Sequence, residues 1–91
     1  MAHILTDEEA LSALRAGSPD EVPNFKMLLS AVDDGLLTET GRNWTTDSTI
    51  DPTAKLAAML LLISLNDGTP LPDSYRYKVV QLDAKAKAMA I

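Results

Sequence analysis

The sequence contains no cysteine, which excludes disulfide bonds, thiolate zinc sites and cysteine nucleophiles. Its single histidine, His3, lies near the N-terminus, where we expect mobility, so it supports neither a histidine-rich metal centre nor a Ser/His/Asp set. Aromatic residues are few, namely Phe25, Trp44, Tyr75 and Tyr77, so the core must be aliphatic. Positive charge is also scarce: 8 Lys and Arg against 13 Asp and Glu give a net charge of −5. This net charge argues against a protein whose main role is to bind the phosphate backbone of nucleic acid.

What the sequence does hold is the composition of one globular domain. Of its 91 residues, 46% are hydrophobic and 23% are charged, which is typical of a chain with a single core. The most apolar stretch, residues 56–65, is shorter than the roughly 20 residues that a membrane-spanning helix needs. Because the N-terminus also lacks a secretory signal pattern, we expect a soluble, cytoplasmic protein with no membrane association.

The first half of the sequence predicts two helices. Thr6 and Glu9 form a capping box at the start of a short helix, which we expect to stop at residues 16–17. A longer helix is expected over residues 23–40, with Gly41 as its stop. Apolar residues recur along it at helical spacing and predict one buried face: Phe25, Leu28, Leu29, Val32, Leu36 and Leu37.

The second half predicts two more helices. Asp51 can cap a helix that begins at Pro52 and ends at residues 66–68. This helix is apolar nearly all the way round, so it must be covered on most sides. A fourth helix is expected to start near Asp73 and to run to the chain end. Its apolar stripe is Tyr75, Val79, Leu82, Ala86 and Met89, and its other faces carry Arg76, Lys78, Lys85 and Lys87.

These patterns predict an all-α fold, a small bundle of about four helices with a polar loop over residues 42–51 and an amphipathic C-terminal helix. Residues 1–91 form a single domain. We expect residues 1–67 to form the core bundle and residues 68–91 an extended linker plus a docking helix. The net charge is −7 over residues 1–51 and +2 over residues 52–91, which suggests complementary surfaces between copies of the chain.

Little in the sequence points to catalysis. Asp33-Asp34-Gly35 resembles a fragment of a calcium loop but lacks the other ligands, so a solvated helix face is favoured. Asp73-Ser74 resembles the attachment site of a carrier domain, but basic residues follow it, so helix capping is favoured. We therefore expect no enzyme activity, no cofactor and no metal site.

Two features leave alternatives open. Trp44 either folds back over the ends of its own helices or anchors a contact with another subunit, a role in which tryptophan is favoured. The basic face of the last helix is either an ordinary solvated face or a docking surface for an acidic protein. Binding to DNA or a membrane is the least favoured alternative, because four Lys and Arg side chains form only a narrow basic stripe.

Several segments, taken in order, resemble a known family. They are LTDEEA (5–10), LLSA (28–31), TGR before an aromatic residue (40–42), DP (51–52) and KLAAMLLL (55–62). Over residues 4–67 this order resembles the head–tail connector, or adaptor, family of long-tailed double-stranded DNA phages. The resemblance implies a non-enzymatic virion structural protein that is assembled in the host cytoplasm and located in the neck of the virion.

The resemblance also implies partners. Family members form homo-oligomeric rings, typically of about a dozen subunits, beneath the portal protein. Such a ring extends the channel through which DNA passes without specific binding, and it joins the portal to a neck or tail-completion protein. Two rival hypotheses remain: a small non-viral helical module for protein interaction or regulation, and a nucleic-acid-binding domain, which the net charge opposes.

On this hypothesis the functional residues serve assembly only. We expect Leu29, Val32, Leu60 and Ile63 to hold the subunit core. The expected subunit interface consists of Arg42, Trp44, Thr45, Thr46 and Ile50. The expected portal-docking residues are Tyr75, Arg76, Lys78, Val79, Leu82, Lys85 and Lys87.

Overall fold

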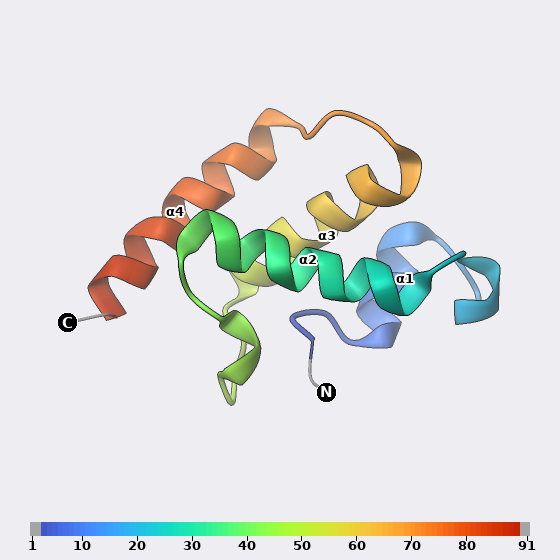
Figure 1. The fold of residues 1–91 in the computed structure, drawn as a ribbon, viewed down its shortest axis with the longest axis horizontal. Helices are drawn as coiled ribbons and strands as arrows, with labels where there is room; N and C mark the ends of the chain where they lie inside the picture. Colours follow the sequence, from blue (N-terminus) through green and yellow to red (C-terminus); the bar gives the residue numbers. More distant parts are fainter. Residues whose placement is uncertain (1–2, 90–91) are drawn as a thin grey trace.

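The computed structural model describes residues 3–89 as an all-α bundle, as the sequence predicts (Figure 1). Within that range the α-helices are α1 (Asp7–Leu14), α2 (Phe25–Thr40), α3 (Pro52–Asp67) and α4 (Asp73–Met89). Two short 3₁₀ turns, η1 (Pro19–Glu21) and η2 (Trp44–Thr46), lie in the connections before and after α2. Residues 90–91, into which the last helix was expected to run, lie outside the described residues.

Two helix starts follow the predicted capping chemistry, and a third departs from it. The capping box at the start of α1 is formed: the Glu9 backbone N–H donates to Thr6 Oγ1 at 3.1 Å, and the Thr6 backbone N–H donates to Glu9 Oε1 at 2.9 Å. Asp51 caps α3 by accepting a hydrogen bond from the Thr53 backbone N–H at 2.8 Å. The start of α2 differs from the prediction, because Asn24 adopts a left-handed conformation (φ 58°) and the helix begins only after it.

Left-handed residues end the first three helices. Gly41 (φ 72°) and Gly68 (φ 69°) end α2 and α3 as predicted, because glycine enters this region without the penalty that a Cβ imposes. Arg15 takes the same conformation (φ 57°) after α1. The first helix therefore stops slightly earlier than expected, and it does so without a glycine.

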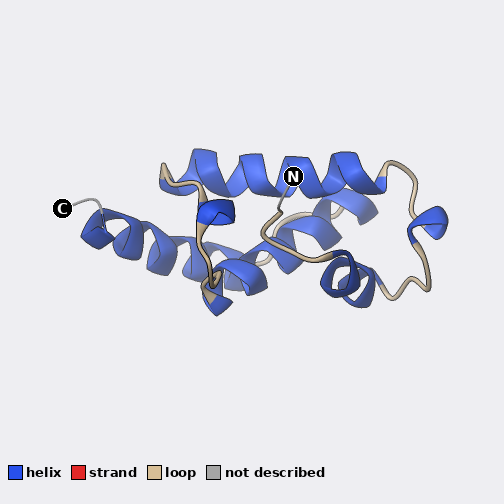
Figure 2. Ribbon diagram, turned by 90° about the horizontal axis from the view of Figure 1, so that it is seen from below, coloured by secondary structure: helices blue, strands red, loops and turns tan. Residues whose placement is uncertain are grey.

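Helix α3 is the centre of the bundle, and α1, α2 and α4 all pack against it. In Figure 2, α2 forms one side of the molecule, and α1 and α4 lie on the other side. The buried residues of α2 recur at helical spacing, as predicted: Phe25, Leu29, Val32 and Leu36. The buried residues of α3 are Ala54, Ala57, Ala58, Leu61 and Leu62.

Gly35 lies on the face of α2 that contacts Leu61 of α3. A Cβ at this position would lie 2.8 Å from Leu61 Cδ2, which is closer than van der Waals contact allows. We expect Gly35→Val to destabilise the protein by about 1–3 kcal/mol in chemical denaturation, because it overpacks this contact. Ala31→Val, on the exposed side of the same helix, is the control and should cost less. If Leu61→Ala in the same chain does not reduce the cost of Gly35→Val, the close contact is not its cause.

Helix α4 belongs to the bundle, and this corrects the expected division of the chain. Tyr75, Leu82 and Ala86 are buried in the same core as α2 and α3, so residues 73–89 are not a detached docking arm. The extended segment over residues 69–72 only joins the antiparallel helices α3 and α4. The described chain is one body with one core.

Several apolar side chains that were expected in the core are uncovered. Leu37 is exposed, so it does not widen the buried face of α2, and Met89 at the end of α4 is exposed as well. On α3, Leu56 is 50% exposed, while Leu60 and Ile63 are half-buried. Helix α3 is thus covered on three sides by its own chain, and the side that carries Leu56 remains open.

Candidate interaction surfaces

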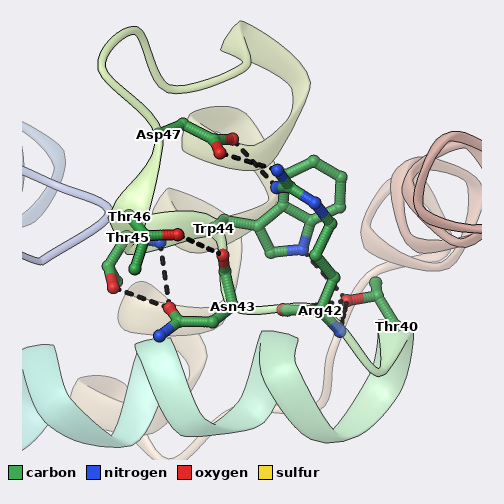
Figure 3. Close-up of polar contacts among 7 residues, drawn as sticks. All are labelled: Thr40, Arg42, Asn43, Trp44, Thr45, Thr46 and Asp47. Carbon is green, nitrogen blue, oxygen red and sulfur yellow. Dashed lines mark hydrogen bonds and ion pairs between the residues drawn. The ribbon is translucent and has the colours of Figure 1, made fainter. Parts of the chain in front are cut away.

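The loop after α2 folds around Trp44, whose side chain is only 1% exposed (Figure 3). Its indole N–H donates to Thr40 Oγ1 at 3.0 Å, and the Thr40 hydroxyl in turn donates to the Leu36 backbone carbonyl at 2.7 Å. The single polar atom of the indole is therefore satisfied at the C-terminal end of α2. This arrangement makes Trp44 part of the core of its own chain.

Arg42 covers the outer face of the Trp44 ring. Its guanidinium carbon lies 4.5 Å from the ring centroid, within the range of a cation–π interaction. The same guanidinium donates two hydrogen bonds to Asp47, at 2.9 and 2.6 Å, in the bidentate geometry that arginine and carboxylate favour. The hydrogen bond from Arg42 lowers the pKa of Asp47, although partial burial acts in the opposite direction. The loop is thus held by its own side chains.

The residues predicted for the subunit interface have different positions in this loop. Trp44 cannot anchor a contact with a neighbour in this conformation, because its ring lies inside its own chain; that assignment is corrected here. Ile50 is half-buried against the core, and Arg42 and Thr45 are half-buried as well. Thr46 is exposed and accessible to a neighbour. The structure thus shows the other role that the sequence left open for Trp44, folding back over its own helices; the anchor role rested on residue type alone, and the sequence carried no signal of the Thr40 acceptor.

The predicted portal-docking residues of α4 fall into two groups. Tyr75 and Leu82 are buried and Val79 is half-buried, so these three pack in the bundle and cannot dock on a partner in this conformation. Burial, together with the charge of Glu39, raises the pKa of the Tyr75 hydroxyl. The apolar stripe that was assigned to a partner is instead the attachment of α4 to its own core.

The basic side chains of α4 remain at the surface. Lys85 donates to Asp51 Oδ2 at 2.9 Å, and Lys87 lies 3.0 Å from Asp83 Oδ2 one turn earlier. Arg76 is exposed and Lys78 is half-buried, and neither forms an ion pair with the described residues. Arg76 and Lys78 are therefore available to form ion pairs with a partner.

A second apolar stripe on α4 was missed by the sequence analysis. Tyr77 is 71% exposed and Val80 is 68% exposed, and Ala84 lies one turn further on the same outward face. The spacings of three and four residues between them are those of a helix face, so this stripe was visible in the sequence. It was overlooked because the stripe on the opposite face, which is buried, already accounted for the amphipathic pattern of the helix.

Residues 3–5, which the sequence predicts to be mobile at His3, pack against α2 in the structure. His3 Nδ1 lies 2.5 Å from Asp33 Oδ2, and the Ile4 backbone N–H donates to Asp33 Oδ1 at 3.0 Å. Ile4 and Leu5 are buried in the core. Asp33 therefore has a structural partner and is not simply part of a solvated face, although Asp34 beside it is exposed.

Two ion pairs tie distant segments together and make stability depend on pH. Lys55 donates to Glu9 Oε1 at 2.6 Å; this hydrogen bond, followed by one from a backbone N–H, lowers the pKa of Glu9 below 4.5. Burial raises the pKa of Asp51, but hydrogen bonds from Lys85 and from a backbone N–H outweigh it, and the pKa lies below 3.8. Both carboxylates thus bind protons more weakly in the folded chain than in the unfolded chain.

Acid is therefore expected to destabilise the protein. A group whose pKa is lowered by folding contributes stability above its unfolded pKa and loses it as the pH falls through the folded value. The melting temperature should decline as the pH drops below about 4, and the Glu9→Gln, Asp51→Asn double variant should show a shallower decline. An equally steep decline in that variant would assign the acid sensitivity to other groups.

The described part of the chain gathers no three His, Asp or Glu side chains that could hold a metal ion. None of the helices over residues 3–89 combines the length and the apolar character needed to cross a membrane. Comparison with protein-family models, with curated proteins and with solved structures finds no match to this chain.

Proposed function

We propose that the protein is a structural subunit that assembles into a ring, as a head–tail connector beneath a phage portal. The observation that carries the proposal is the outward apolar stripe of Tyr77 and Val80 on α4, which are 71% and 68% exposed, since contiguous exposed apolar surface marks interaction sites. Large apolar side chains are exposed on α2, α3, α4 and the segment before α4: Met27, Leu37, Leu56, Leu65, Leu71, Tyr77, Val80 and Met89. The location beneath a portal is supported only by the resemblance of residues 4–67.

The roles divide between two regions of the surface. On α4, Arg76, Lys78, Lys85 and Lys87 surround the outward stripe of Tyr77 and Val80, and this combination suits an acidic, partly apolar surface such as we propose for the portal. Thr46 and the exposed edge of the loop over residues 42–50 face a neighbouring subunit or a neck protein. The negative net charge suits a channel wall, because DNA phosphates do not adhere to it.

A second function, that of a small helical interaction module outside a virion, is favoured by a different observation. Among the described residues, no buried side-chain nitrogen or oxygen atom lacks a hydrogen-bond partner, so the single chain already satisfies its polar core. Such a protein would remain a monomer or dimer at all concentrations. It would offer α4 to one partner.

Native mass spectrometry with a portal protein from the same genome tests the proposal. We expect complexes in which several copies of this chain bind one portal ring. The chain alone is the first control, because a connector can need the portal as a template. The Arg76→Glu, Lys78→Glu double variant is the second control, and it should bind the portal more weakly. A chain that stays monomeric with and without the portal would contradict the proposal and favour the interaction module.

A further inference from the structure

We propose that the hollow between the end of α2 and the start of α4 receives an aromatic side chain with a polar tip, tryptophan or tyrosine, from the protein that binds α4. This inference rests on the proposed role of α4 as a binding surface, and it names the chemistry that the partner must present there. The hollow combines an apolar lining, a buried tyrosine and one charged side chain of each sign.

The hollow lies where α4 runs beside the C-terminal end of α2 (Figure 1). It has a volume of about 410 Å³, and its apolar lining comes from Leu71 before α4 and from Val79 and Val80 on α4. Leu71 and Val80 are exposed, so this lining is open to solvent in the single chain. Such a lining favours an occupant with an apolar body, because contact removes apolar surface of both from water.

The floor of the hollow carries a polar group that its own chain leaves free. Tyr75 is only 4% exposed, and its ring packs in the core. Its hydroxyl forms no hydrogen bond with the described residues, yet no fully buried side-chain oxygen among them lacks a partner. The hydroxyl must therefore reach solvent, and the hollow that Tyr75 lines provides the opening. Tyr75 stays in the core, and a partner reaches its hydroxyl by entering the hollow.

This hydroxyl selects an occupant with a polar tip. A wholly apolar side chain would close the Tyr75 hydroxyl off from water without giving it a hydrogen bond, which is unfavourable. An indole N–H or a phenol O–H can instead donate to the Tyr75 oxygen while the ring covers the apolar lining. Leucine and phenylalanine meet only the apolar requirement, so tryptophan and tyrosine fit the hollow better.

Two charged residues, Glu39 of α2 and Arg76 of α4, also line the hollow. Both are exposed, and neither forms an ion pair within the described part of the chain. Glu39 lies close enough to raise the pKa of the Tyr75 hydroxyl, so its carboxylate is a second acceptor beside the floor of the hollow. Arg76 offers a guanidinium that favours a carboxylate. The charges therefore indicate a protein segment in which an acidic residue accompanies the aromatic one.

Titration with two uncharged probes, followed by two-dimensional NMR of the full chain, tests the hollow by itself. The probes are N-acetyltryptophanamide and N-acetylphenylalaninamide, which differ in the polar tip of the ring. We expect the tryptophan probe to shift backbone amide signals of residues 71–80 in a saturable way. It should bind at least about threefold more tightly than the phenylalanine probe, because it supplies the hydrogen bond to Tyr75.

Tyr75→Phe removes the hydroxyl and should abolish the preference for the tryptophan probe. Because this hydroxyl has no hydrogen bond to lose within the described chain, the melting temperature should stay the same. Tyr77→Phe is the matched control: it makes the same change two residues later, at a side chain that is 71% exposed and outside the hollow, and should keep the preference. Arg76→Ala should leave the uncharged probes unaffected and weaken binding of the portal protein.

The outcomes separate this inference from the proposed function. Shifts that do not saturate or that lie outside residues 71–80, or equal probe preferences in Tyr75→Phe and Tyr77→Phe, overturn the inference. The connector proposal then still stands if the portal binds the wild type. Saturable, tryptophan-selective binding in the hollow without any binding of the portal supports the inference and removes the portal as the partner.

Discussion

Trp44→Ala is expected to lower the free energy of unfolding by about 3–5 kcal/mol, the range for truncation of a large buried side chain. The indole fills the space between the end of α2 and the rest of the bundle, and its removal also takes away the N–H donor to Thr40. Urea denaturation followed by circular dichroism measures the loss. Fluorescence is unsuitable, because the substitution removes the only tryptophan.

Two further variants separate the causes of this loss. Trp44→Phe keeps an aromatic ring but loses the hydrogen bond, so we expect a smaller cost of about 1–2 kcal/mol. Thr46→Ala, on the exposed side of the same loop, should change stability by less than about 0.5 kcal/mol. If Trp44→Ala weakened assembly without changing stability, the indole would be a surface anchor after all, in contradiction to its burial.

Leu82→Ala is expected to cost about 2–5 kcal/mol, because Leu82 is fully buried where α4 meets the bundle. Val80 provides a matched comparison, since it lies on the same helix but is 68% exposed. Val80→Ala should change stability by less than about 0.5 kcal/mol and should act on portal binding instead. Equal and small effects of the two variants would mean that α4 is a separate arm, as expected from the sequence.

Local chemistry made most of the fold predictable. The capping box at Thr6, the Asp51-Pro52 start and the glycine stops at residues 41 and 68 each depend on a few neighbouring residues, and the structure confirms them. The Asn24 start of α2 was missed because a left-handed asparagine has no pattern beyond the residue itself. Local signals therefore determined where helices begin and end to within a few residues.

The partners of each face were harder to predict, because they depend on tertiary packing. Three residues of the periodic stripe of α4, Tyr75, Leu82 and Ala86, are buried, whereas Met89 at its end is exposed. Periodicity also cannot say whether a stripe packs on its own chain or on another protein. The same limit explains Trp44, whose partner Thr40 becomes a neighbour only when the chain turns back at Gly41. The apolar character of α3 predicted cover on most sides, but which side stays open appears only when its neighbours are placed.

The packing of the N-terminal segment has a consequence for synthesis on the ribosome. Helix α1 has only 8 residues, too few to persist by itself in water, and its main support is α3, about forty residues later in the chain. The buried Ile4 depends in the same way on later residues, because its backbone pairs with Asp33 of α2 and Lys55 of α3. During synthesis, residues 4–14 must therefore remain unstructured until α3 has emerged, and they complete the fold late.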